Sequence, residues 1–139
     1  MVQLIIGKKG KGKTKHLLDK VNTEVQNVSG NIVYLDKSTK HMYELNNKIR
    51  LIDVSSYLIT NSDEFIGFIS GIISQDHDLE QMYFDSFLKI ACIEGEDIEP
   101  IITKLEKISE AFNVNFVLSI SVDEDEVPAS MKDKIIVSL

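Results

Sequence analysis

The sequence has little of several residue types, and each shortage excludes a class of protein. It holds one cysteine, Cys92, in 139 residues, so it can form neither an internal disulfide nor a cysteine-rich zinc site. No stretch approaches the roughly 20 apolar residues that a membrane-spanning helix needs. The apolar run near the start, Val2–Ile6, is too short for a secretory signal. We therefore expect a soluble, cytoplasmic protein with no segment inserted in a membrane.

Arginine is almost absent, and the charges are unevenly spread along the chain. Arg50 is the only arginine beside 14 lysines, and the formal net charge is −7. Residues 1–50 carry 10 basic and 4 acidic side chains, whereas residues 51–139 carry 5 basic and 18 acidic ones. An acidic chain lacks the broad basic face that duplex nucleic acid requires, which argues against that partner. The basic N-terminal part instead predicts a local anion-binding site.

Short apolar runs alternate with segments of helical period, which is the pattern of an α/β protein. Strands are expected at Val2–Ile6, Ile32–Leu35, Ile49–Val54, Gln81–Phe84, Asn115–Ser121 and Ile135–Leu139. Helices are expected at Lys13–Gln26, Asn61–Ser74 and Ile98–Phe112, with a short one at Ser38–Leu45. This order predicts a three-layer αβα sandwich with a mainly parallel sheet. The length and the absence of a linker predict one domain over residues 1–139.

Two glycines interrupt the apolar pattern of the helix expected at residues 61–74. Gly67 and Gly71 are four residues apart, so they lie on the same side of that helix. Glycine lowers helix propensity, which indicates a packing reason for its presence. We therefore expect a neighbouring backbone to approach this helix closely at the two glycines.

The strongest pattern is a turn rich in glycine and lysine between the first strand and the first helix. It covers Gly7–Thr14 and matches G-x-x-x-x-G-K-[ST] at every fixed position. In such a loop, glycines let the backbone approach phosphate oxygens, and the N–H groups of the loop and helix point at the anion. Lys13 would reach the β- and γ-phosphates, and Thr14 would place its hydroxyl on Mg²⁺. The nucleotide-binding set predicted here is Gly7, Lys8, Lys9, Gly10, Lys11, Gly12, Lys13, Thr14 and Lys15.

Three aspartates compete for the role of the carboxylate that holds Mg²⁺. Asp36, Asp53 and Asp85 each stand at the C-terminal end of an expected strand, where ligands bind in parallel sheets. Arg50 lies inside the strand before Asp53, which indicates an edge strand. Asp85 follows a buried run and is the preferred metal ligand, with Asp36 and Asp53 as alternatives.

With this loop and the strand before Asp85, the chain resembles the P-loop NTPase superfamily, and RecA-like ATPases in particular. The resemblance implies that ATP or ADP binds with Mg²⁺, that Thr14 and Asp85 hold the metal, and that Lys13 is catalytic. Asp36 matches the place where this group often carries its catalytic carboxylate, usually as glutamate. Ser119 and Ser121 fall where a polar γ-phosphate sensor often sits. In the loop alone, the chain is similar to the much longer pilus-retraction (twitching motility) ATPases.

Two departures from the family pattern bear on the rate of hydrolysis. Many members place a glutamate directly after the metal-binding aspartate, where this chain has Ser86, and Arg50 is the only arginine that could offset charge on the γ-phosphoryl group. We therefore expect a Mg²⁺-dependent ATPase whose hydrolysis is slow or depends on a partner. A nucleotide-dependent regulatory switch with little turnover is the alternative, and a small-molecule kinase is less well supported. These functions imply a protein partner, which a second copy of the chain could be.

Overall fold

The computed structural model describes residues 1–139 and places six strands in one sheet. All neighbouring strands are parallel, in the order β3-β2-β4-β5-β1-β6. The strands are β1 (Val2–Ile6), β2 (Asn31–Asp36), β3 (Ile49–Asp53), β4 (Leu79–Phe84), β5 (Asn115–Ile120) and β6 (Ile135–Ser138). Because the strands are parallel, the loops after β1, β2, β4 and β5 all leave from the same edge of the sheet.

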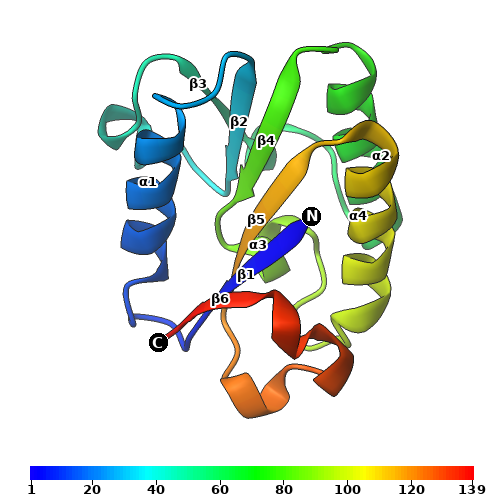
Figure 1. Cartoon of the computed structure of the whole chain (residues 1–139). Coiled ribbons are helices and arrows are strands. Elements are labelled where there is room, and N and C mark those ends of the chain that lie inside the picture. The colour runs from blue at the N-terminus through cyan, green and yellow to red at the C-terminus, as the bar shows by residue number, and fades with distance from the viewer.

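Helices cover both faces of this sheet (Figure 1). On one face, α1 (Lys13–Glu24) packs through Leu17, Leu18 and Val21 in a buried cluster of nine residues. On the other face lie α2 (Ser62–Ser74) and α4 (Glu99–Phe112), within a second buried cluster of 26 residues. A short helix, α3 (Phe87–Ile90), directly follows β4 and belongs to the larger cluster.

The larger cluster is built around four phenylalanines. Phe84 is fully buried at the end of β4, and its ring lies 5.4 to 6.1 Å from those of Phe65, Phe87 and Phe116 in edge-to-face geometry. Such aromatic pairs add to the free energy gained by burying apolar area. This packing fixes the end of β4, and with it the residue that follows, Asp85.

The structure confirms the αβα fold with its parallel sheet and corrects several details. The short helix expected at Ser38–Leu45 is a single 3₁₀ turn, η1 (Met42–Glu44), and α3 was not expected at all. The close approach expected at Gly67 and Gly71 is wrong, because a Cβ at either position would meet no atom within 4 Å. None of the helices has the length and apolar character required to cross a bilayer.

Candidate functional site

The segment Gly7–Thr14, called the phosphate loop below, connects β1 to α1. Gly10 and Gly12 have φ values of 85° and 95°, in the left-handed region that side chains other than glycine rarely adopt. No side chain caps the N-terminus of α1, so the N–H groups of its first turn are free to meet an anion. The loop therefore has the backbone geometry that phosphate binding requires.

Lys13 is held at the start of α1 with little exposure. Lys13 is only 8% exposed, and its Nζ donates to the carbonyl oxygen of Lys8 at 3.2 Å. Burial lowers the pKa of this ammonium group, and the nearby Asp85 carboxylate partly opposes that shift. No carboxylate oxygen lies within 4 Å of Nζ. The charge is thus poorly compensated, which favours an anionic ligand beside it.

Asp85 is the centre of a buried hydrogen-bond network that joins three elements. Thr14 on α1 donates to its Oδ1 at 3.1 Å, and Ser119 on β5 donates to the same oxygen at 3.1 Å. Tyr34 on β2 donates to Oδ2 at 2.9 Å, and the backbone N–H of Ser86 donates to Oδ1 at 2.9 Å. Burial raises the pKa of Tyr34, helped by the Asp85 charge, so this hydroxyl stays a donor. The carboxylate is therefore fixed in position beside the phosphate loop.

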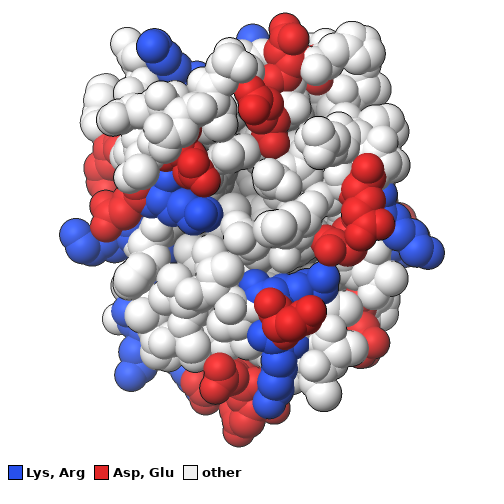
Figure 2. All heavy atoms as spheres, in the orientation of Figure 1, with Lys and Arg blue, Asp and Glu red and all other residues white.

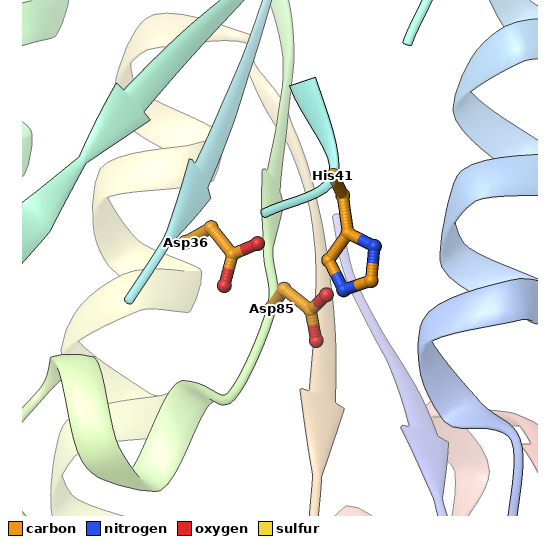
Figure 3. Close-up of side chains that lie close together, drawn as sticks. All are labelled: Asp36, His41 and Asp85. Atoms are coloured by element: carbon orange, nitrogen blue, oxygen red, sulfur yellow. The ribbon is translucent and has the colours of Figure 1, made fainter. Parts of the chain in front are cut away.

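Asp36, at the end of β2, turns its carboxylate toward Asp85 and His41 (Figure 3). Ligand atoms of these three residues lie within 4.8 Å of one another. Asp36 Oδ1 accepts from the N–H of Lys37 at 2.7 Å, whereas Oδ2 is buried without any partner. Burial, reinforced by the charge of Asp85, raises the pKa of Asp36 to about 6. An unpartnered buried oxygen of this kind indicates a missing proton, cation or ligand.

A cleft of about 530 Å³, within the range of ~300–1,000 Å³ usual for ligand sites, opens over Lys13, Thr14, Asp85 and His41. Asp36 is buried beside Asp85 and does not line the cleft. It is polar, with Leu88 as its one hydrophobic lining residue. Five lysines line it against two carboxylates, so its charge is opposite in sign to that of the whole chain. The lining residues are Lys9, Gly10, Gly12, Lys13, Thr14, Lys37, Lys40, His41, Asp85, Ser86, Leu88, Lys89, Glu94, Ser119 and Ser121.

The structure separates the residues proposed from the sequence into two groups. Lys9, Gly10, Gly12, Lys13 and Thr14 line the cleft, together with Asp85. The residues proposed from the loop that do not line it are Gly7, Lys8, Lys11 and Lys15.

Asp53 is removed from the cleft as well. It lies at the end of the edge strand β3, where its carboxylate accepts from the N–H and Oγ of Ser55. These contacts are local and stabilise the turn that follows β3. Of the three candidate aspartates, only Asp36 and Asp85 therefore come together.

Charges outside the cleft are largely paired or dispersed. Lys8 turns away from the cleft, and its Nζ lies 3.3 Å from Asp123 and 3.6 Å from Glu126. Basic and acidic side chains are interspersed on the face shown in Figure 2, with no continuous basic area across it. Arg50 faces Asp76 at 3.8 Å and does not line the cleft. Four of the ten basic side chains in residues 1–50 line the cleft, namely Lys9, Lys13, Lys37 and Lys40.

Sequence reasoning missed Tyr34 and His41. Tyr34 is fully buried in the middle of a strand, and a tyrosine at such a position is usually interpreted as a residue of the hydrophobic core. His41 follows β2 in an irregular segment, and its position beside two carboxylates depends on how that segment folds back. The only available signal was that both residues flank Asp36 in the sequence.

The raised pKa of Asp36 predicts a pH-dependent difference between the protein and its Asp36→Asn variant. The pKa is about 6 in the folded state and 3.8 in a model peptide, so the folded state binds the proton more tightly. The protonated Asp36 therefore raises the free energy of unfolding relative to Asp36→Asn most strongly below about pH 4. This contribution is lost as the pH rises through 6. Between pH 4.5 and 7.5 this loss should be roughly 2 kcal/mol. Urea unfolding of both proteins without Mg²⁺ at the two pH values measures it, and a constant difference would contradict the assignment.

Comparison with known proteins adds evidence on the fold. No family model and no curated protein matches the chain. Among solved structures, it is similar to the KaiC-like protein PH0186 from the hyperthermophilic archaeon Pyrococcus horikoshii OT3, with 20% identity and a TM-score of 0.60 over 85% of this chain. It is also similar to the pCW3 conjugation coupling protein TcpA in its monomer form with ATPγS, with 12% identity and a TM-score of 0.51 over 96% of this chain.

These likenesses show the fold. The fold expected from the resemblance to P-loop NTPases, a parallel sheet between two layers of helices, is therefore present. It spans 61% of the length of PH0186 and 46% of the length of TcpA.

Proposed function

We propose that the chain is a nucleotide-binding domain that takes ATP or ADP with Mg²⁺ and hydrolyses ATP slowly or only with a partner. One observation carries the proposal: Thr14 at the end of the phosphate loop bonds directly to Asp85 at 3.1 Å, inside a polar cleft lined by lysines. This contact joins the two parts that Mg²⁺-nucleotide binding needs, a loop for phosphates and a fixed carboxylate. The ATPγS held by the similar protein TcpA agrees with the proposal.

The oxygen atoms beside the loop suit Mg²⁺. Thr14 Oγ1 and Asp85 Oδ1 are hard donors, which Mg²⁺ prefers, and the unpartnered Oδ2 of Asp36 lies nearby. When bound, the metal would neutralise charge on the phosphate oxygens. Lys13 and the first-turn N–H groups of α1 would bind the phosphates. Asp36, the candidate base, is 2% exposed and does not line the cleft, so it would have to become accessible to accept a proton from the attacking water.

Slow or partner-dependent hydrolysis rests on what surrounds the cleft. Ser86 occupies the position after Asp85, and its N–H is shared between Asp85 Oδ1 and Ser119 Oγ, so no second carboxylate stands there. No arginine lines the cleft. Phosphoryl transfer usually requires an arginine at this place for a high rate, so a partner would have to supply one. A second copy of this chain could act as that partner through Arg50, whose side chain is 60% exposed and lies 3.8 Å from Asp76.

A regulatory switch with little turnover is the second candidate function. It is favoured by the network around Asp85, in which groups from α1, β2, β4 and β5 meet at one carboxylate. A nucleotide that competes for the Thr14 hydroxyl would therefore change hydrogen bonds that link α1, β2 and β5 to the end of β4. The two functions separate in one assay, which measures ATP affinity and steady-state phosphate release with and without Mg²⁺. Tight binding without release favours the switch, and an absence of ATP binding contradicts the proposal.

The metal assignment predicts different outcomes for two aspartate variants. In Asp85→Asn, Mg²⁺ should strengthen ATP binding about tenfold less than in the unmodified protein, because the variant lacks the negative charge that attracts the cation. Asp53→Asn removes the same charge from the end of the neighbouring strand and should leave the Mg²⁺ effect unchanged. Titration calorimetry with and without Mg²⁺ measures both. Equal responses of the two variants would show that Asp85 is not the metal ligand.

A further inference from the structure

Three lysines that line the cleft come from segments outside the phosphate loop. Lys37 and Lys40 follow β2, Lys89 lies on α3, and all three are exposed. None has a carboxylate oxygen within 4 Å, although the chain contains 22 acidic residues. Unpaired cations that face one cleft raise the local potential and attract anions to it. We call Lys37, Lys40 and Lys89 the distal lysines.

The sheet order separates the distal lysines from the loop. The ends of β1 and β2 are three strand positions apart, which corresponds to about 14 Å at a strand spacing of ~4.8 Å. The Thr14–Asp85 contact lies between them and marks where the metal and the terminal phosphate of a nucleotide would be. Lys37 and Lys40 therefore come from the β2 side of that contact, opposite to Lys13, and Lys89 comes from α3, which follows β4.

The charges in the cleft exceed what the loop requires. Lys9 and Lys13 belong to the phosphate loop, and the carboxylates of the cleft lining are Asp85 and Glu94. With Asp85 directed at Thr14, the other carboxylates near the distal lysines are Glu94, which forms no ion pair with them, and the buried Asp36, which interacts with the charge of Lys37. None of the three distal lysines belongs to the phosphate loop, which leaves them available to a second anion.

We infer that the distal lysines form a second anion subsite, which binds the phosphate group of a second ligand beside the terminal phosphate of the nucleotide. Lysine suits this ligand because its ammonium group acts as a mobile point charge for phosphate oxygens. His41 also lines the cleft, on the side of Asp36 and Asp85, and its Nδ1 lies 3.3 Å from Glu44 Oε1. The inference rests on the proposed function, because it takes the phosphate loop as the nucleotide site.

The subsite is tested by NMR with the phosphate loop filled. The protein is saturated with Mg²⁺ and a non-hydrolysable ATP analogue, and inorganic phosphate is added at constant ionic strength while backbone amide shifts are followed. Saturable shifts are expected at residues 37–41 and 88–90. The triple variant Lys37→Ser/Lys40→Ser/Lys89→Ser should bind phosphate about tenfold more weakly, since several charged contacts are lost together. Parallel titrations with a sugar phosphate and a nucleoside monophosphate show which kind of phosphorylated ligand binds most tightly.

A matched variant controls for net charge. Lys48→Ser/Lys107→Ser/Lys132→Ser also removes three exposed, unpaired lysines, all outside the cleft, and should bind phosphate like the unmodified protein. Equal losses in both triple variants, or no saturable shift with any of the three ligands, would overturn the inference. If the ATP analogue itself does not bind, the proposed function fails instead. The phosphate titration of Lys13→Ala then tests the subsite by itself.

Discussion

An alanine in place of Lys13 is expected to lower the affinity for Mg²⁺-ATP by roughly 100-fold and to abolish phosphate release. Lys13 is the one lysine of the cleft that is buried, and its Nζ is held by the Lys8 carbonyl rather than by a carboxylate. A buried cation without an ion-pair partner gains more from a phosphate than an exposed lysine does, because water screens it less. Titration calorimetry and a phosphate-release assay measure the two effects.

Lys13→Ala should lose ATP affinity and phosphate release while it remains folded. Burial lowers the pKa of Lys13, so the folded state disfavours its charged form. Removing the side chain removes this cost, and only the Lys8 carbonyl loses a hydrogen-bond donor. The free energy of unfolding of Lys13→Ala should therefore stay within about 1 kcal/mol of that of the unmodified protein.

Lys11→Ala is the matched control for this prediction. Lys11 lies in the same loop, but it is exposed and does not line the cleft. Its removal should weaken ATP binding no more than a few-fold, because an exposed charge in water contributes little. Similar losses in the two variants would indicate general electrostatic attraction by the loop rather than a specific phosphate contact at Lys13.

The fold could be predicted from the sequence largely because its signals are local. The buried runs before Gly7 and Asp85 are short and apolar, and the helices between strands have clear apolar faces, so the parallel αβα arrangement follows. The four-residue helix α3 could not be predicted, since it holds less than two turns and begins at Ser86 in a left-handed conformation. Its position is set by Phe87 packing into the phenylalanine cluster, which is a tertiary effect.

Less of the candidate site could be predicted, because part of it depends on strand order. The pattern of Gly7–Thr14 identifies the loop by itself. That Asp36 meets Asp85 while Asp53 does not follows from β2 lying next to β4, with β3 at the edge. In the sequence, Asp36, Asp53 and Asp85 all stand at the end of an expected strand, so the sequence does not show which two of them meet. The same holds for the distal lysines, which are 52 positions apart between Lys37 and Lys89 and meet only through the parallel sheet.

The phenylalanine cluster packs around the end of β4, directly before Asp85. Phe84→Ala is therefore expected to lower the free energy of unfolding by about 4 kcal/mol. The Phe84 ring is fully buried and contacts three other phenylalanine rings, so the truncation leaves a cavity that the sheet cannot easily close. Phe112→Ala is the control, because Phe112 is 59% exposed at the end of α4 and should lose less than about 1 kcal/mol. Urea unfolding at neutral pH measures both changes.

Phe84 also immediately precedes Asp85, so its removal should affect the site as well as stability. In the fraction that stays folded, a loosened β4 end would misplace the carboxylate that Thr14, Tyr34 and Ser119 hold. The Mg²⁺-dependent part of ATP binding should then weaken more than Mg²⁺-independent binding, which relies on the loop at β1. Equal weakening of both, measured well below the unfolding midpoint, would mean that the core stabilises the whole domain without positioning Asp85 in particular.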